Sequence, residues 1–187
     1  MGFYMEHDIN RKRKYSFNKY SGLYAMLFVR EKKRLILHLG RTMHIEHIGS
    51  TAVQGLGGKN ILDLMIGDVP LHFKNRIKQL SELGYVFHSE NGSKNRLFFV
   101  RDTKYNGKRV RIHLHLINIK SKEWAEKLAF RDYLKSNKTA MLKYGVIKRK
   151  AALIAKGDKG VYMKEKDVFI RSTIRKALSI KKAVNSH

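Results

Sequence analysis

A Gly-Ser turn and a lone acid are the first residues of this sequence whose types and spacing suit chemistry. Gly49 and Ser50 follow a strand-like run, 44–48, and open a segment, 50–53, that suits a short helix with Ser50 as its N-cap. Backbone N–H groups and a hydroxyl at such a turn favour anions, typically phosphate. Asp63 lies in the next apolar run, where it could hold a divalent cation that neutralises the same phosphate. The alternative is that Ser50 only caps a helix and Asp63 is a satisfied buried acid.

Lys59 brings a further positive charge to this part of the chain. The Gly58-Lys59 pair does not complete a P-loop, which needs GxxxxGK[ST] opening a helix. Val53 occupies the first glycine position, and Asn60 follows the lysine. We therefore expect Lys59 to stabilise an anion without a nucleotide-binding loop of that type.

Two histidines at i and i+2, His113 and His115, lie in the most clearly alternating strand of the sequence. Residues two apart on a strand share a face, so the two imidazoles could chelate a metal or move protons. Asp63 is the most plausible third ligand. Arg109 and Arg111 share that face, where they favour an anion and repel a bare cation. The alternative is a polar sheet face with two half-exposed histidines.

A helical segment contains the sequence Phe130-Arg131-Asp132-Tyr133-Leu134. Arg131 and Asp132 are adjacent, so they project about 100° apart on a helix, and we do not expect them to pair. One interpretation is surface charge on an amphipathic helix. The other is that Arg131 reaches a substrate phosphate.

The composition describes a strongly basic globular chain. Lys and Arg total 40 against 15 Asp and Glu among 187 residues, a formal net charge of +25, and 43% of the residues are hydrophobic. A disordered basic tail is excluded as a description of the whole, because disorder also needs low hydrophobicity. The charge attracts polyanions such as RNA or DNA, although the basic residues are dispersed along the chain. A solvated, lysine-rich surface is the alternative interpretation.

The chain contains no Cys, which excludes disulfides, thiolate metal sites and a cysteine nucleophile. No run of about 18 apolar residues is present, so we expect no membrane span. Residues 1–14 are charged and lack the apolar region of a signal peptide. We therefore expect a cytoplasmic protein.

Periodicity predicts the elements that must position these residues. An α+β fold is expected, with a mixed sheet, helices packed on it and a helical C-terminal third. Residues 1–14 are expected to form a basic extension, and 15–183 a single domain. The expected helices cover residues 15–39, a segment after Pro70 that ends at Gly84, 121–136, 138–155 and 164–183. The expected strands cover 44–48, 61–67, 85–87, 97–101 and 109–116, with a hairpin turn at Asn106-Gly107.

Long motifs in the same order along the chain resemble the GrpB family over about residues 15–180. HIEHIGSTAVQGL resembles the family's xHIGSTAVPGL, GKNILDLMIG its AKPIIDIxV, IHLHLI its HxHV strand and LAFRDYLKSN its LxFRDYLRxxP. Leu83-Gly84-Tyr85 fits its LxxxGY element. Two YxxxK elements are also matched, by Tyr144 with Lys148 and by Tyr162 with Lys166.

The resemblance implies a nucleotidyltransferase-like core, with the Gly-Ser motif after the first core strand and an acid on the second. It also implies that Tyr144 and Lys148 are ligand-binding candidates, and fusion of some family members to dephospho-CoA kinase points to nucleotide or coenzyme metabolism. Active nucleotidyltransferases carry two acids at i and i+2 of the second strand, but here those positions are Asp63 and Met65. A thioether does not suit Mg²⁺, which takes hard oxygen ligands. Glu46 and Glu90 are the remaining outside candidates for a second acid.

The leading hypothesis is a domain that binds a nucleotide or another phosphorylated ligand, with an incomplete acid set for nucleotidyl transfer. One divalent cation is expected, Mg²⁺ or Mn²⁺, or Zn²⁺ if the histidines ligate it, with Asp63 and His115 as its ligands. Asp63, His113 and His115 are the catalytic candidates. A nucleic-acid-binding module without enzyme activity and a non-catalytic ligand sensor are the alternatives. The candidate ligand-binding residues are His47, Gly49, Ser50, Thr51, Lys59, Arg131, Tyr144 and Lys148.

Overall fold

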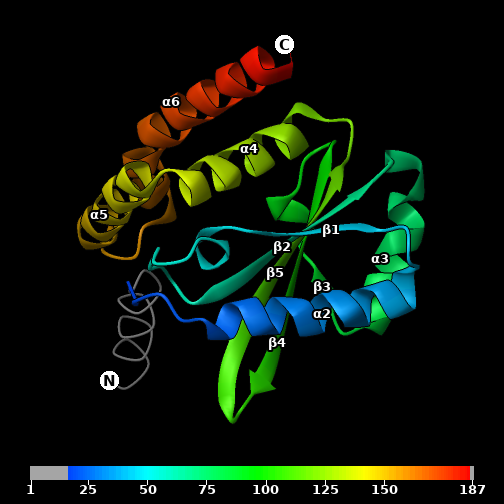
Figure 1. The fold of residues 1–187 in the computed structure, drawn as a ribbon. Helices are drawn as coiled ribbons and strands as arrows, with labels where there is room; N and C mark the ends of the chain where they lie inside the picture. Colours follow the sequence, from blue (N-terminus) through cyan, green and yellow to red (C-terminus); the bar gives the residue numbers. More distant parts are fainter. Residues whose placement is uncertain (1–16, 186–187) are drawn as a thin grey trace. The chain divides into compact units, whose positions relative to one another are not determined.

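The computed structural model describes residues 17–185, and these divide into two compact units. The sheet unit contains a five-stranded sheet and the helices that pack on it, and the helical unit contains most of the C-terminal third (Figure 1). The expected extension 1–14 lies outside the described residues. A single domain over 15–183 stays a prediction. The described residues are 21–52 and 60–128 in the sheet unit, and 17–20, 53–59 and 129–185 in the helical unit.

The elements follow the expected order, and most lie close to the expected positions. The α-helices are α2 (Leu23–Leu39), α3 (Phe73–Glu82), α4 (Lys122–Ser136), α5 (Lys138–Ala155) and α6 (Lys159–Asn185). The strands are β1 (His44–Ile48), β2 (Ile61–Asp68), β3 (Val86–Phe87), β4 (Arg96–Tyr105) and β5 (Lys108–Asn118). Short 3₁₀ helices are η1 (Ser50–Ala52), η2 (Pro70–His72) and η3 (Ser89–Asn91).

The sheet has the strand order β1-β2-β5-β4-β3. Its central pair, β2 and β5, is parallel, and the other pairs are antiparallel. The hairpin between β4 and β5 turns at Asn106 and Gly107, whose φ values of 48° and 74° suit the two central positions of a tight hairpin turn. The mixed sheet with packed helices confirms the expected α+β class.

One face of the sheet packs against α2 and α3 and forms the main core. Side chains alternate between the two faces of a strand, so every second residue of β2 and β5 reaches this core. Leu35 of α2, Leu64 of β2 and Leu114 of β5 are fully buried there. Burying each such side chain stabilises the fold by roughly 1.5–3 kcal/mol.

The opposite face of the sheet is apolar only in part. Ile48, Met65 and Ile117 are buried there, and Trp124 and Leu128 of the N-terminal half of α4 pack against them. The remaining residues of this face include charged and imidazole side chains. We call it the polar face.

Helix α2 begins at Leu23, later than the expected start at residue 15. The Ser21 hydroxyl accepts a hydrogen bond from the Leu23 amide at 3.3 Å, which is how serine marks a helix start. Upstream, Asn18 exchanges two backbone hydrogen bonds with Gly58, and these need an extended chain. Residues 15 and 16 lie outside the described part.

In the helical unit, α5 has the expected bounds and α6 begins five residues before the expected start. The Asn137 side chain caps α5 by accepting a hydrogen bond from the Ala140 amide at 2.8 Å. The Asp158 carboxylate accepts one from the Val161 amide at 2.9 Å, which starts α6 at Lys159. Although α6 spans 27 residues, no helix within residues 17–185 is both long and apolar enough to cross a membrane.

Candidate functional site

Asp63 and His113 lie side by side on the polar face of the sheet. They are register partners in the parallel pair of β2 and β5, and Asp63 Oδ1 lies 3.4 Å from His113 Nδ1. The Asp63 side chain is 24% exposed and that of His113 is 26% exposed. An acid and an imidazole therefore meet where solvent reaches both.

The turn after β1 approaches the Asp63 carboxylate closely. Ile48, the last residue of β1, is the register partner of Asp63, and Gly49 then turns the chain with φ +73°. A Cβ atom on residue 49 would lie 2.2 Å from Asp63 Oδ2, so only glycine fits. Ser50 follows as the first residue of η1 and is half-buried. The predicted turn and the predicted acid thus lie together.

His47 and Thr51 hold this turn from the core side of the sheet. Both are buried, and His47 Nε2 lies 3.0 Å from Thr51 Oγ1. The Thr51 hydroxyl donates its single proton to the Ile61 carbonyl at 3.1 Å, so His47 Nε2–H must be the donor to Thr51. The His47 ring also stacks on Phe28 of α2, with centroids 4.9 Å apart. These contacts give both residues a role in positioning the turn.

His115 lies two residues further along β5, opposite Met65, and has a different environment from His113. Arg96 Nη1 donates to His115 Nδ1 at 3.3 Å, so the remaining proton of the neutral ring is on Nε2. Burial lowers the pKa of His115 well below its usual value of 6.5, and the positive charges of Lys127 and Arg96 lower it further. His115 is therefore a neutral imidazole at pH 7.

The position of the missing second acid is part of the apolar cluster on the polar face. Met65 is fully buried against Ile48, Ile117 and Trp124. Glu46 of β1 is its register partner and therefore lies on the same face, diagonal to Asp63. Within residues 17–185, no group of three or more His, Asp and Glu side chains is arranged to hold a metal ion.

The other candidate residues belong to the helical unit. Lys148 is buried and donates from Nζ to the Gly57 carbonyl at 2.7 Å. Its Nζ also lies 5.6 Å from the centre of the Tyr144 ring, which stacks on Phe169 with centroids 5.3 Å apart. Loop residue Lys59 has its Nζ 4.5 Å from the ring centre of another tyrosine, Tyr162.

Sequence reasoning missed Tyr162 and Lys166 as site candidates in the helical unit. Lys166 is buried, and its Nζ lies 4.1 Å from the Tyr162 ring centre, so two lysines share this ring. Their signal in the sequence was the second YxxxK element, in which i, i+4 spacing places the lysine on the same helical face as the tyrosine.

One expectation about Arg131 was wrong. Arg131 Nε lies 2.7 Å from Asp132 Oδ1, and the arginine side chain is only 13% exposed. Although the two Cβ atoms diverge around the helix, the long arginine side chain bends back to reach its neighbour. The Arg131 side chain is thus largely buried, with its guanidinium paired to a carboxylate.

The family model described as GrpB protein matches residues 15–176. The chain belongs to the GrpB family. UPF0157 protein YqkA of Bacillus subtilis (strain 168) is 29% identical over 177 residues, which are 94% of this chain and 50% of YqkA. This GrpB-family chain therefore spans about half the length of that curated relative.

Solved structures are also similar to this GrpB-family chain. The conserved protein GrpB from Enterococcus faecalis matches with a TM-score of 0.75 and 27% identity, covering 89% of this chain and 99% of the other. The Cid1 poly(U) polymerase with bound MgGTP matches with a TM-score of 0.48 and 15% identity, covering 79% and 47%. The second similarity is too low to support a conclusion about activity.

Proposed function

We propose that the sheet unit binds a nucleotide or another phosphorylated ligand on its polar face. The observation that carries this proposal is the Gly49 turn held against the partly exposed Asp63 carboxylate. In this arrangement the backbone of the turn and the Ser50 hydroxyl receive phosphate oxygens. Asp63 would hold one divalent cation beside them.

The donor set suits Mg²⁺ or Mn²⁺ better than Zn²⁺. Magnesium sites commonly use one or two carboxylates, several waters and the phosphates of the substrate. Zinc sites in proteins need three or four protein ligands. His115, the candidate nitrogen ligand, accepts a hydrogen bond from the Arg96 guanidinium. The positive charge of that group opposes a cation there. When bound, the cation would neutralise phosphate charge.

For nucleotidyl transfer, the chain offers His113 as the base. Its Nδ1 faces Asp63, which leaves Nε2 to accept the proton of an attacking hydroxyl. The new bond joins that hydroxyl oxygen to the α-phosphorus, and the bond from this phosphorus to the pyrophosphate oxygen breaks. His113 differs from His115 in this respect, because His113 is paired with an acid and His115 with a guanidinium.

The test measures thermal stabilisation by ATP and GTP, each with MgCl₂ or with EDTA. We expect magnesium-dependent stabilisation of the natural sequence and its loss in Asp63→Asn, with Asp167→Asn on the exposed face of α6 as the matched control. Equal magnesium-dependent stabilisation of Asp63→Asn would refute the role of Asp63. Pyrophosphate release in the same samples separates an enzyme from the ligand sensor that the buried Met65 favours.

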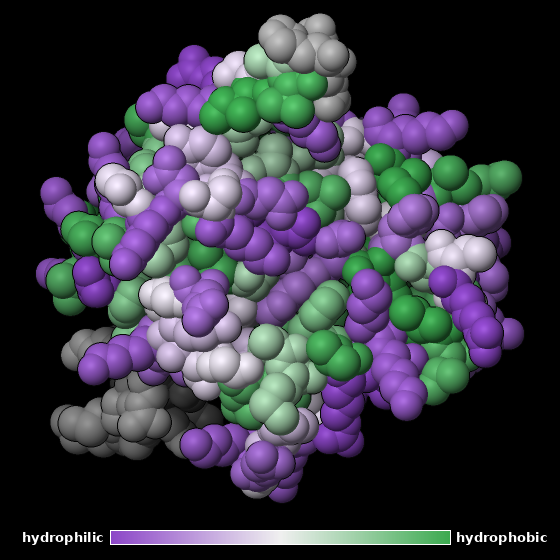
Figure 2. All heavy atoms as spheres, in the orientation of Figure 1, coloured by the Kyte–Doolittle hydropathy of each residue, from purple (hydrophilic) through white to green (hydrophobic). Residues whose placement is uncertain are grey.

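A second candidate function, nucleic-acid binding, is favoured by the β4–β5 hairpin. Its exposed end presents Lys104, Lys108, Arg109 and Arg111 against one acid, Asp102. Hydrophilic side chains are spread over the face seen in Figure 2 and are not confined to one patch. A basic ribbon of this kind suits a phosphate backbone.

Nucleic-acid binding is tested by the salt dependence of single-stranded RNA affinity. We expect Lys108→Gln/Arg109→Gln to reduce the slope of log K against log salt by roughly 0.7 for each lost phosphate contact. Lys150→Gln/Lys176→Gln, an exposed pair in the helical unit, is the matched control. Absence of binding at low salt would exclude this function.

A further inference from the structure

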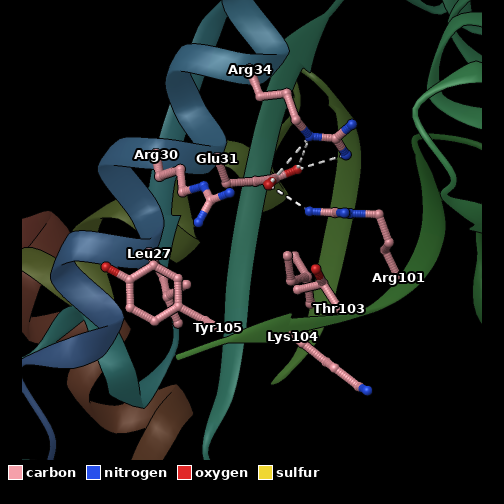
Figure 3. A pocket seen from close by; sticks show the side chains of 9 residues that line it. Leu27, Arg30, Glu31, Arg34, Arg101, Thr103, Lys104 and Tyr105 are labelled. Atoms are coloured by element: carbon pink, nitrogen blue, oxygen red, sulfur yellow. Dashed lines mark hydrogen bonds and ion pairs between the residues drawn. The ribbon is translucent and has the colours of Figure 1, made fainter. Parts of the chain in front are cut away.

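A small pocket opens between α2 and the β4–β5 hairpin, and basic side chains surround it (Figure 3). Its lining includes Arg30 and Arg34 from α2 and Arg101 and Lys104 from β4. Glu31 is the only carboxylate among the lining residues that the structure describes. Four cationic groups against one acid make this pocket strongly attractive to an anion.

Glu31 is already saturated by protein donors. Its buried carboxylate accepts hydrogen bonds from Arg101 Nη2 at 2.6 Å, from Tyr85 Oη at 2.8 Å and from Arg34 Nε at 3.2 Å. One negative charge therefore faces two guanidinium groups in direct contact. Among residues 17–185, no second carboxylate lines the pocket to balance the remaining positive charge.

One hydrogen-bond donor of Arg101 lacks an acceptor among the described residues. Its Nε is buried and has no hydrogen-bond partner among the residues that the structure describes. Leaving a buried charged donor without an acceptor is unfavourable, so such donors normally have a partner. A ligand oxygen in the pocket would supply the missing acceptor once the Arg101 side chain turns its Nε–H towards it.

The volume of the pocket limits the size of that ligand. The cavity measures about 110 Å³, whereas a water molecule occupies about 30 Å³ of the liquid, and pockets for drug-sized molecules start at about 300 Å³. A single tetrahedral oxyanion fits within this volume, whereas a whole nucleoside is too large to be enclosed by it. Arginine forks match the oxygens of phosphate in spacing and charge.

We propose that this pocket binds a phosphoryl group, supplied either by inorganic phosphate or by the end of a small phosphomonoester. Arg101 and Arg30 provide the donors, and Arg34 holds Glu31 so that the carboxylate does not occupy the pocket. The Thr103 hydroxyl, also in the lining, is a further donor.

This site is separate from the one proposed around Asp63. Arg101 is the register partner of Ile112, a core residue whose side chain faces α2. His113 is the next residue of β5, so its side chain faces the opposite side of the sheet. Binding in the pocket therefore does not depend on the Asp63 site.

The test follows the Arg101 Nε–H signal in ¹H–¹⁵N spectra during titration with sodium phosphate or glycerol 3-phosphate. Sodium chloride at equal ionic strength controls for screening. We expect a saturable shift of this signal, which Arg101→Lys identifies by deleting it. Saturation by phosphate alone indicates the free ion, and saturation by both compounds indicates a phosphomonoester site.

Matched variants locate the binding. Arg30→Ala is expected to raise the Kd about tenfold, the effect of losing one charge-assisted hydrogen bond. Arg41→Ala removes another exposed arginine, one that does not line the pocket, and should leave the Kd unchanged. Asp63→Asn should also leave it unchanged, which separates this proposal from the function proposed above. An Arg101 signal that neither compound moves, or equal Kd values for Arg30→Ala and Arg41→Ala, would overturn it.

Discussion

The backbone of Gly49 touches the carboxylate of Asp63 so closely that a single added carbon would lie 2.2 Å from Oδ2. The contact joins the end of β1 to the middle of β2 on the polar face, where Ile48 and Asp63 are partners. It explains why a turn and an acid that are separate in the sequence act as one feature in the fold.

Replacing Gly49 by alanine should therefore both destabilise the protein and displace the Asp63 carboxylate. Gly107 offers a matched control, because its φ of +74° is nearly the same as the +73° of Gly49 but nothing lies within 4 Å of its added Cβ. The backbone penalty, about 1–2 kcal/mol, is common to both variants. We expect Gly49→Ala to lose at least about 1 kcal/mol more than Gly107→Ala in chemical denaturation. Equal losses of unfolding free energy would show that the structure accommodates the added Cβ beside Asp63 at no cost.

Thr51→Val should loosen the turn from the other side of the sheet. The substitution keeps the shape but removes the acceptor for His47 Nε2–H and the donor to the Ile61 carbonyl. Leaving these buried groups unpaired should cost about 1–3 kcal/mol of unfolding free energy. Thr42→Val, at an exposed position before β1, is the control and should change stability little. A neutral Thr51→Val would mean that the His47–Thr51 bond does not hold the turn.

The buried, neutral His115 should give the protein an acid-sensitive step above the range in which carboxylates titrate. Because burial and neighbouring cations lower its pKa in the folded state, the unfolded chain binds this proton first as the pH falls. The contribution of neutral His115 to the unfolding free energy is therefore fully present above about pH 6.5. It decreases as the pH falls towards the folded-state pKa, by up to about 1.4 kcal/mol per pH unit.

The measurement is the unfolding free energy between pH 7.5 and 5 for the natural sequence and His115→Gln. We expect the variant to have a shallower pH dependence in this interval. His44→Gln removes an exposed histidine of β1 and should keep the original slope. Identical slopes for all three proteins would contradict the account of His115.

Lys148→Met should destabilise the helical unit because the buried ammonium group is the donor to the Gly57 carbonyl. Methionine fills similar space but leaves that carbonyl without this donor, which should cost about 1–3 kcal/mol. Lys150→Met, at an exposed position two residues later, should be close to neutral. If Lys148→Met keeps its stability but loses nucleotide-dependent stabilisation, Lys148 serves the ligand and not the fold.

Local sequence patterns predicted much of the sheet unit. The apolar run of β2 and the alternation of β5 predicted two strands, and Asn106-Gly107 predicted the turn between β4 and β5. The pattern also placed His113 and His115 on one face. It could not distinguish them, because the difference comes from Arg96 and Asp63, which other strands bring into contact.

Contacts between distant segments account for most of what the sequence did not reveal. Glu31 meets Arg101 across 70 residues, and no local pattern relates the two. The predicted start of α2 was too early because the apolar periodicity continues upstream of Leu23. There the backbone of Asn18 forms hydrogen bonds with Gly58 and is not helical. The Arg131–Asp132 pair was not predicted because adjacent residues of a helix point in different directions. The arginine side chain is long enough to reach the neighbouring carboxylate all the same.

The parallel pairing of β2 with β5 also determines when the candidate site can form during folding. Asp63 and His113 meet only after the chain has passed through α3, β3 and β4 and returned to the centre of the sheet. Such non-local pairing requires the closure of a long loop, which slows folding. Ligand binding by Asp63 and His113 would require the paired strands β2 and β5. During refolding, this binding should therefore appear after the helices have formed.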